Sequence, residues 1–268
     1  MAEEGQADPP PPAAAPEGEE APKATPACID LTDYPLKCDY FEGMHMLPEE
    51  VEKLDGAPNF RQVNGFPVFG VAQSTEEGMV KVLEKTKVNP EDKPGKIFWF
   101  NVRKEPVVFL NGTPYAPRDP AELHKNLNVS FSVDQLDDLE KSLADLVKEK
   151  SQKNNETLKV HKDLAFAENP LERESEEVDL KVEQIKGLQE VYDSLRGNGF
   201  EELTVCRIPT TEERAPAEYC FDMMLDILKN EPASVPCIFS DQQGRGRTTL
   251  GMVVACLIKE IQITSELR

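Results

Sequence analysis

A short apolar segment, a turn with two glycines and a second apolar segment follow one another between residues 236 and 259, "PCIFSDQQGRGRTTLGMVVACLIK". The first segment has the length of a buried strand, and the second has that of a helix beginning near Arg247 or Thr248. Glycines at 244 and 246 let consecutive backbone N–H groups curl towards one point, which the positive end of the helix also faces. Arg247 carries a guanidinium group that can pair with two phosphate oxygens. This order of strand, turn and helix predicts a phosphate-binding turn in a layered α/β protein.

The same turn has a simpler interpretation. The glycines would then only relieve crowding between strand and helix, and the arginines would lie on the surface. Two Gly, two Arg and two Thr within residues 244–249 favour the phosphate site instead.

The rest of the chain alternates predicted strands and helices. Residues 66–73 and 96–103 have the apolar composition of buried strands, and a helix capped by Ser74 or Thr75 is predicted between them. Such a strand–helix–strand order is typical of a parallel crossover and hence of α/β proteins. The remaining predictions, in chain order, are a hairpin turning at Asn111-Gly112, a helix from Ser132 to about Lys153 with a capping box completed by Gln135, a strand in "TLKVHK" (157–162), a helix over 178–197, a strand over 203–209, a helix over 216–230 and a strand over 236–240.

These elements predict one phosphate-binding α/β domain over residues 27–268, with a central, mostly parallel sheet flanked by helices. Residues 1–26 are rich in Pro, Ala, Glu and Gly and contain no large apolar residue after Met1. Such a segment cannot bury enough surface to offset its chain entropy, so a disordered tail is expected there.

The charge of the chain argues against several classes of partner. Fifty acidic and 30 basic residues give a formal net charge of −20. Nucleic acids and anionic lipids attract an excess of Lys and Arg, so broad binding to either is not expected, although one cleft can still be basic. No apolar run approaches the roughly 20 residues of a membrane span, and the N-terminus lacks the pattern of a signal peptide. Six cysteines without a paired spacing are typical of a reducing compartment, and a cytoplasmic location is predicted.

The turn also resembles a known phosphate-binding loop. "FSDQQGRGRTT" is similar to the loop of cysteine-dependent phosphatases, which has Cys, five residues, then Arg and Ser or Thr. Between Gly56 and Lys259 the chain further resembles the paladin-like proteins and related cysteine phytases, in "APNFRQV", "PVFGVAQST", "WFNVRKEPVVFLNGTPYAPRD", "CRIPTTEERAP" and "TTLGMVVACLI". The resemblance implies a protein-tyrosine-phosphatase-like fold and tandem units in a longer chain. It implies a phosphate site made by Gln242, Gln243, Gly244, Arg245, Gly246, Arg247 and Thr248.

The two positions that carry the chemistry depart from the family pattern. Asp241 stands where the family has its nucleophilic cysteine, and Glu212 stands where it has its general acid, an Asp. A carboxylate can form an acyl phosphate, but phosphatases that use one rely on Mg²⁺ and a second acid two residues on, where this chain has Gln243. Cys237 lies four residues upstream, within the strand, and cannot replace the thiolate. Both departures predict that the unit does not hydrolyse phosphate esters.

The sequence is compatible both with a pocket that binds anions and with a pocket that is closed. The carboxylate of Asp241 could lie beneath a bound phosphate, or it could take the loop N–H groups or Arg247 itself and close the pocket. Arg61, Arg103 and Arg118 match recurring basic positions of the family, and each could line a substrate cleft or form a scaffold ion pair. His45, His124 and His161 share no spacing with Cys or acidic residues, so neither a metal nor another cofactor is expected.

Three functions remain compatible with the sequence. The favoured one is a catalytically degraded phosphatase unit that serves as a phosphate-sensing or interaction module for a phosphorylated small molecule or a phosphoprotein. The second is an active phosphatase acting on inositol phosphates, phosphoinositides or phosphotyrosine. The third is a structural domain whose pocket is closed by Asp241.

Overall fold

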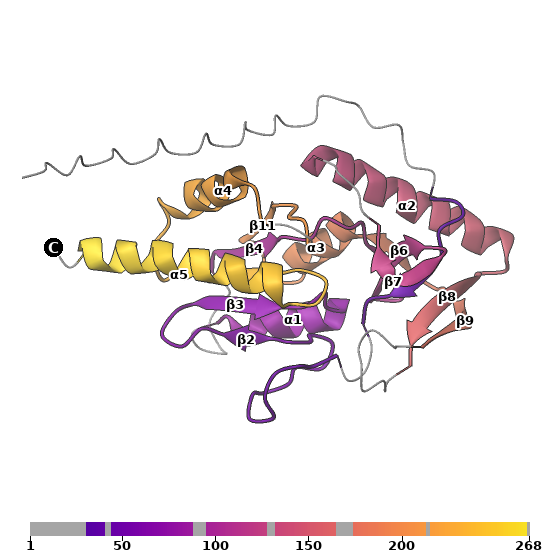
Figure 1. Cartoon of the computed structure of the whole chain (residues 1–268), viewed down its shortest axis with the longest axis horizontal. Coiled ribbons are helices and arrows are strands. Elements are labelled where there is room, and N and C mark those ends of the chain that lie inside the picture. Colours follow the sequence, from indigo (N-terminus) through magenta and orange to yellow (C-terminus); the bar gives the residue numbers. More distant parts are fainter. Residues whose placement is uncertain are drawn as a thin grey trace, which may run out of the picture.

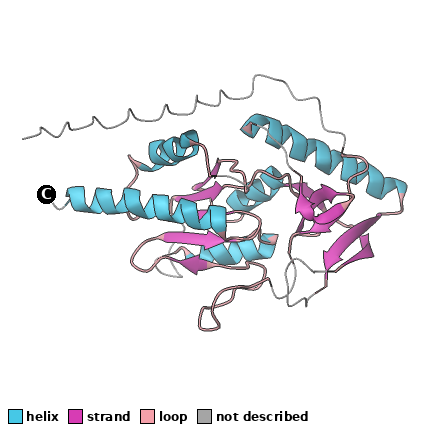
Figure 2. Ribbon diagram, viewed as in Figure 1, coloured by secondary structure: helices cyan, strands magenta, loops and turns pink. Residues whose placement is uncertain are grey.

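The computed structural model describes residues 31–40, 44–87, 95–127, 132–164, 174–212 and 215–266. These residues form five helices and two sheets (Figure 1), and the strands gather into two groups (Figure 2). The tail predicted over residues 1–26 lies outside the described residues. Among the described helices, none combines the length and apolar character needed to cross a membrane.

The first sheet has five strands in the order β11-β4-β12-β3-β2. Four of them are mutually parallel, and only β2 runs antiparallel to its neighbour. This arrangement confirms the predicted α/β fold with a central, mostly parallel sheet. The strands are β11 (Leu203–Arg207), β4 (Ile97–Asn101), β12 (Cys237–Ser240), β3 (Val68–Val71) and β2 (Arg61–Gln62).

Helices cover both faces of this sheet because its strands are apolar on both sides. In β4, Ile97 and Trp99 pack with the helices of one face, and Phe98 and Phe100 pack with those of the other. Phe100 stacks on Phe239 of β12 with 4.7 Å between ring centroids. The first face holds α1 (Glu76–Lys85) and α3 (Leu188–Gly197), and the second holds α4 (Glu218–Leu228) and α5 (Gly246–Glu266).

Trp99 ties the centre of the sheet to the end of β12. Its side chain is fully buried, and its Nε1 donates a hydrogen bond to Ser240 Oγ over 2.8 Å. Ser240 is the last residue of β12 and immediately precedes Asp241. The hydrogen bond from Trp99 therefore fixes the position of the residue at which the predicted phosphate loop starts.

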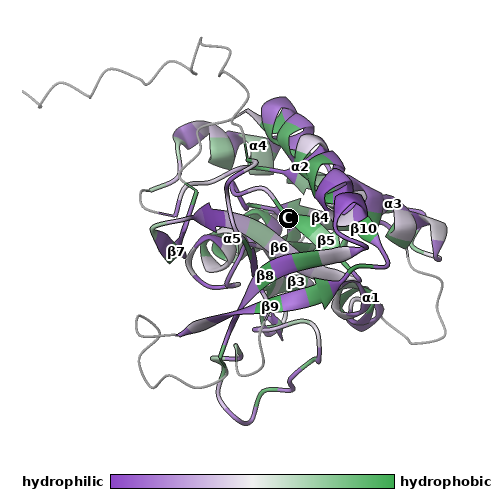
Figure 3. Ribbon diagram, turned by 90° about the vertical axis from the view of Figure 1, so that its right-hand side faces the viewer, coloured by the Kyte–Doolittle hydropathy of each residue, from purple (hydrophilic) through white to green (hydrophobic). Residues whose placement is uncertain are grey.

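The second sheet, which the sequence analysis did not predict, has seven mostly antiparallel strands. Its order is β10-β5-β6-β1-β8-β9, with β7 paired to β6. Helix α2 (Val133–Lys153) packs Leu139, Leu143 and Val147 against it, and hydrophilic and hydrophobic residues alternate along that helix (Figure 3). The strands are β1 (Leu36–Cys38), β5 (Val108–Leu110), β6 (Thr113–Asp119), β7 (Glu122–Asn126), β8 (Thr157–Asp163), β9 (Ser175–Lys181) and β10 (Ile185–Gly187).

The local start and turn signals are confirmed. Thr75 caps α1 by accepting from Gly78 N at 3.0 Å, and Ser132 and Gln135 form the capping box of α2. The β5–β6 hairpin turns at Asn111 and Gly112, whose φ angles of 50° and 77° suit the predicted Asn-Gly turn.

The helix predicted over 178–197 is wrong in its first half. Residues 178–187 belong to β9, the connecting turn and β10, and α3 begins only at Leu188. The segment "VDLKV" alternates apolar and polar residues, and in β9 Val178 and Leu180 are half-buried between exposed neighbours. Period-two alternation of this kind favours a strand, and pairing with β8 satisfies its backbone.

Candidate phosphate-binding site

The predicted phosphate loop, residues 241–245, joins β12 to the N-terminus of α5 at the carboxyl end of the parallel strands. Gly244 has φ +68°, and a Cβ atom there would lie 2.4 Å from the backbone N of Ala72, just after β3. Only glycine fits both the left-handed conformation and this close approach. The glycine turn therefore lets the loop close tightly over the edge of the sheet.

The carbonyl groups of the loop are held by the surrounding scaffold. Gln243 O accepts from Asn59 Nδ2 at 2.8 Å, and Gly244 O accepts from Arg61 Nη1 at 2.6 Å. Gln242 O accepts from the backbone N–H of Gln73 at 3.1 Å. Of the two roles that the sequence allows for Arg61, a ligand contact or a scaffold interaction, its bond to the loop favours the scaffold role. Burial lowers its pKa from the usual value, with Asp241 acting in the opposite direction.

Asp241 is buried within the loop, with 3% of its surface exposed. Its Oδ1 accepts the N–H of Gly244, and its Oδ2 accepts the N–H of Thr248 at 3.1 Å. The carboxylate thereby binds an amide in the first turn of α5, where negative charge is favoured. In the described part of the chain, the amides of Gln243, Arg245 and Gly246 have no protein acceptor. The carboxylate occupies part of the amide nest and leaves part of it free.

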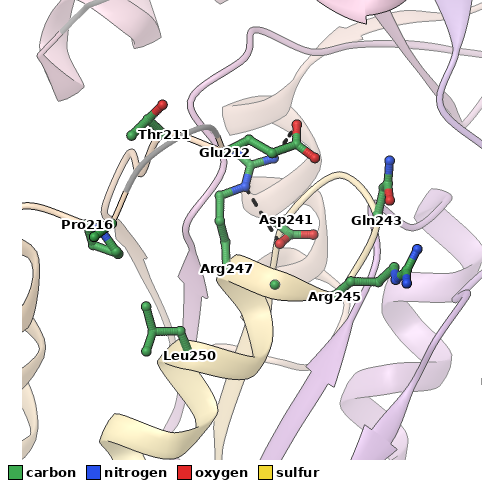
Figure 4. A pocket seen from close by; sticks show the side chains of 10 residues that line it. Thr211, Glu212, Pro216, Asp241, Gln243, Arg245, Arg247 and Leu250 are labelled. Carbon is green, nitrogen blue, oxygen red and sulfur yellow. Dashed lines mark ion pairs between the residues drawn. The ribbon is translucent and has the colours of Figure 1, made fainter.

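Arg247 lies between three carboxylates and is mostly buried. Its Nη1 donates to the Glu105 oxygens at 3.0 and 3.2 Å and to Thr210 O at 3.0 Å. Its Nε lies 3.7 Å from Asp241 Oδ2, and its Nη2 lies 3.9 Å from Glu212 Oε2, as the dashed lines in Figure 4 mark. Burial acts to lower the pKa of Arg247, but Glu105, Asp241 and Glu212 outweigh it and raise that pKa. The guanidinium is held by one edge, and its other edge faces the space between Asp241 and Glu212.

A pocket of about 340 Å³ opens in front of this guanidinium edge (Figure 4). Ala215, Pro216 and Leu250 form an apolar wall, and Arg245 on the loop is exposed to solvent. The pocket has room for a phosphate group with part of its ester. Six predicted site residues line it: Glu212, Asp241, Gln243, Arg245, Gly246 and Arg247.

Three other predicted site residues do not line the pocket. Gly244 packs against the backbone after β3, and Thr248 is fully buried. The Gln242 side chain turns away, donating to Asp39 Oδ1 at 3.0 Å and accepting from Asn126 Nδ2. These three residues shape the loop. Their predicted part in phosphate binding could only be through their backbone.

Glu212 is linked to the loop through Asn126 of β7, a residue that the sequence analysis missed. Asn126 Nδ2 donates to Glu212 Oε2 at 3.2 Å and also to Gln242 Oε1. The Glu212 side chain is about half exposed, with 48% of its surface accessible. Its neighbour Glu213 lies outside the described residues. Asn126 carries no sequence signal of its own, because only the fold of the second sheet brings β7 to this edge.

Arg103 and Arg118 form scaffold ion pairs and do not line the pocket. Both pair with the buried carboxylate of Asp39, Arg103 through Nη2 and Oδ2 at 2.7 Å and Arg118 through Nη2 and Oδ1. Burial acts to raise the pKa of Asp39, but the two arginines outweigh it and hold that pKa below its usual value. Of the two interpretations open for these arginines, their contacts favour the structural one.

Within the described residues, Cys237 does not offer an alternative nucleophile, and no metal cluster is found. Burial raises the pKa of Cys237 to about 11, so its thiol stays protonated at neutral pH. No group of three or more His, Cys, Asp or Glu side chains converges there in the manner of a metal site.

Comparison with known proteins shows which family the chain resembles. Residues 100–259 match the PTP-like phytase family model, whose description names inositol hexakisphosphate. The chain is 31% identical to paladin of Danio rerio over 219 residues, covering 76% of this chain and 24% of paladin. Paladin of Homo sapiens is 31% identical over 246 residues, covering 81% of this chain and 27% of paladin. The chain thus spans about a quarter of the length of these relatives.

Solved structures of two bacterial phosphatases are also similar. One is a PTP-like myo-inositol phosphatase from Mitsuokella multacida, solved with myo-inositol-(1,3,4,5)-tetrakisphosphate. Its TM-score is 0.49 and its sequence identity 18%, and the match covers 84% of this chain and 37% of the phosphatase chain. A PTP-like phytase from Bdellovibrio bacteriovorus has a TM-score of 0.49 and 17% identity over 74% of this chain and 61% of its own. Because the family model covers more than half of its residues, the chain belongs to the PTP-like phytase family.

Proposed function

We propose that this chain is a pseudophosphatase unit, which binds phosphate monoesters at the loop formed by residues 241–245 and the first turn of α5 and does not hydrolyse them. The observation that carries the proposal is the state of Asp241. It stands at the nucleophile position, and its two carboxylate oxygens accept one amide of the loop and one amide in the first turn of α5.

The contacts of Asp241 argue against attack on phosphorus. Each carboxylate oxygen accepts a backbone amide hydrogen bond, which stabilises its negative charge and makes it a weaker nucleophile. Negative charge on Asp241 would also repel the incoming phosphate oxygens. Mg²⁺ relieves such repulsion in carboxylate-dependent phosphatases, but the residue two positions on is Gln243, which supplies no carboxylate ligand.

The remaining donors support binding. The amides of Gln243, Arg245 and Gly246 have no acceptor among the described residues, and Arg247 lines the pocket. Helix α5 points its positive end at the same place. A phosphate in the pocket would thus meet amide and guanidinium donors from several directions, while Asp241 would weaken the affinity by its charge.

The ligand is a phosphorylated small molecule or a phosphoprotein. The family description favours inositol phosphates within this class. The relatives are about four times as long as the part that this chain covers, so we further propose that the unit acts beside other phosphatase-like units as a regulatory module. A cytoplasmic location, inferred from the scattered cysteines, is part of the same proposal.

Family membership keeps an active phosphatase as the second candidate. One experiment separates the two: release of inorganic phosphate from inositol phosphates and a phosphotyrosine peptide by the wild type, Asp241→Cys and Asp241→Asn. Calorimetric titration with inorganic phosphate is run on the same three proteins. The proposal expects no turnover but measurable binding for the wild type, tighter binding for Asp241→Asn and turnover for Asp241→Cys.

Two results would contradict the proposal in different ways. Wild-type turnover that Asp241→Asn abolishes would establish a carboxylate-dependent phosphatase. Failure of phosphate to bind the wild type or to raise its melting temperature would establish a closed, structural pocket, because a ligand that binds only the folded state must stabilise it.

A further inference from the structure

Acidic and basic side chains line the phosphate pocket in equal number. Asp241 is buried in the loop, and Glu212 lies half exposed across from it (Figure 4). Among the described residues, the only other charged side chains of the lining are Arg245 and Arg247. The described lining thus carries no excess of positive charge, although the ligand of the pocket is an anion.

The arginines that face Asp241 already have other partners. Arg247 on α5 places its Nε 3.7 Å from Asp241 Oδ2, but the same guanidinium pairs with Glu105 and lies near Glu212. Arg61 on β2 interacts electrostatically with Asp241, and its hydrogen bonds go to two backbone carbonyls and one hydroxyl group. A fully ionised phosphate would therefore meet a buried carboxylate whose charge water does not screen.

Asp241 can still accept a further hydrogen bond. An ionised carboxylate has about four lone-pair positions and no hydrogen to donate. Its Oδ1 accepts one amide hydrogen, from Gly244, and its Oδ2 accepts one, from Thr248. Each oxygen keeps a lone pair, and Asp241 lines the pocket. The carboxylate is therefore complementary to a ligand that donates a hydrogen bond.

A phosphate monoester is such a donor only while it keeps its second proton. The pKa of that proton is about 6. Below this pH the ester carries a single negative charge and one P–OH group, and above it the ester carries two charges and no hydrogen on phosphorus. A sulfate ester has the same tetrahedral shape, but it carries a single charge and no proton at either pH.

We propose that Asp241 makes the pocket selective for phosphate groups that carry a proton, because its carboxylate accepts a hydrogen bond from the P–OH group. The inference rests on the proposed binding function and specifies the form of the ligand. The other phosphate oxygens accept from the amides of Gln243, Arg245 and Gly246, which have no acceptor in the described part of the chain. A fully ionised ester or a sulfate is rejected, since two acceptors then face each other in a buried place.

Two pairs of probes separate the effect of the proton from those of charge and shape. At about pH 5.5, phenyl phosphate and phenyl sulfate both carry mainly a single charge, and only the phosphate has a hydrogen to donate. At about pH 8, inorganic phosphate and inorganic sulfate both carry mainly two charges, and again only the phosphate keeps a hydrogen. Calorimetric titration of the full chain measures the affinity for each probe at both pH values.

The wild type is compared with Asp241→Asn and with Glu218→Gln. Glu218 makes a matched control, because it is an exposed acidic residue at the start of α4 that does not line the pocket. Its substitution removes the same charge from the same side of the molecule. The melting temperatures of the three proteins verify that they fold.

Each phosphate is expected to bind the wild type at least about tenfold more tightly than its matched sulfate, since an unsatisfied buried acceptor costs at least this factor. Phenyl phosphate should bind more weakly as the pH rises to about 8, and phenyl sulfate should not share this change. In Asp241→Asn each phosphate and its sulfate should bind alike, because a carboxamide can donate as well as accept. Glu218→Gln should keep the wild-type ratios.

The outcomes distinguish this inference from the binding function on which it rests. Equal wild-type affinities for phosphate and sulfate would overturn the inference and leave the phosphate site in place. A preference for phosphate that persists in folded Asp241→Asn would overturn it too, by assigning the selection to another group. If none of the four anions bound at either pH, the proposed function would fail and the inference with it.

Discussion

The carboxylate of Asp39, just after β1, pairs with the guanidinium of Arg103, just after β4, with 2.7 Å between Oδ2 and Nη2 and both side chains fully buried. The pair connects the two sheets of the molecule. Because Asp39 Oδ1 also accepts from Gln242 Nε2, it connects both sheets to the phosphate loop. The geometry of the candidate site therefore depends on a buried ionic contact that does not line the pocket.

Asp39→Asn is expected to destabilise the protein by about 3–5 kcal/mol, because it leaves the buried charges of Arg103 and Arg118 without their partner. Urea unfolding followed by circular dichroism measures this change. Asp55→Asn is the control, since Asp55 pairs with Lys81 on the surface, and the loss of such an exposed ion pair should change the stability little. Equal effects of the two substitutions would show that the buried network contributes little stability.

The same residue predicts a pH dependence. Arg103 and Arg118 hold the pKa of Asp39 below its usual value despite burial, so the folded state favours the ionised carboxylate. Its contribution is then fully present above the unfolded-state pKa of about 3.9 and is lost as the pH falls from there through the folded-state pKa. The difference in unfolding free energy between wild type and Asp39→Asn should shrink as the solution is acidified below that pH. A constant difference would contradict the assigned ion pairs.

Gly244→Ala is expected to disrupt the loop. A Cβ at this position would lie 2.4 Å from Ala72 N, and φ is +68°, so both backbone overlap and strain oppose the substitution. Gly246→Ala is the matched control two residues away, because its Cβ would meet no atom within 4 Å. The melting temperature should fall for the first variant and stay constant or rise for the second. Equal melting temperatures would mean that the loop has another conformation.

Arg247→Lys is expected to weaken binding of inorganic phosphate by roughly tenfold or more, as the loss of a charge-assisted hydrogen bond costs about 1.5–3 kcal/mol. Lysine keeps the charge but lacks the planar fork that can hold Glu105 with one edge and phosphate with the other. Arg245→Lys, at an exposed loop position, should change the affinity little. Calorimetric titration compares the phosphate affinities of the two variants. A larger loss of affinity for Arg245→Lys would show that Arg245, and not Arg247, is the main phosphate ligand.

Two cysteines are expected to resist alkylation in the folded protein. Burial raises the pKa of Cys38 to about 11 and that of Cys206 to about 12, so few thiolates form near neutral pH. Iodoacetamide labelling followed by peptide mass spectrometry should modify both slowly in buffer and rapidly in urea. Rapid modification of either residue in buffer would show that its strand or loop opens locally.

The sequence predicted the parts of the molecule whose signals are local. The glycine turn before Arg247, the cap at Thr75 and the Asn111-Gly112 hairpin each depend on conformational preferences of neighbouring residues, and the fold contains them where predicted. The parallel sheet followed from the order of strands and helices.

Features that depend on distant pairing could not be predicted. A helix was predicted over residues 178–187 because their local sequence does not exclude one. The strand β9 forms there through its pairing with β8, which is not visible in the local sequence. Asp39, Glu105 and Asn126 lie 202, 136 and 115 positions before Asp241, and nothing in their local sequence indicates that they support the same loop. Polar networks of this kind form from the packing of two sheets, which a single sequence does not encode as a short motif.

The hydrogen bond between Trp99 and Ser240 gives the protein a built-in optical reporter. Trp99 is the one tryptophan of the chain, it is fully buried, and its indole is bonded to the residue that precedes Asp241. All indole emission therefore originates from a single dry position beneath the loop. Fluorescence of the unlabelled protein can follow both unfolding of the parallel sheet and any rearrangement that a ligand transmits to the end of β12.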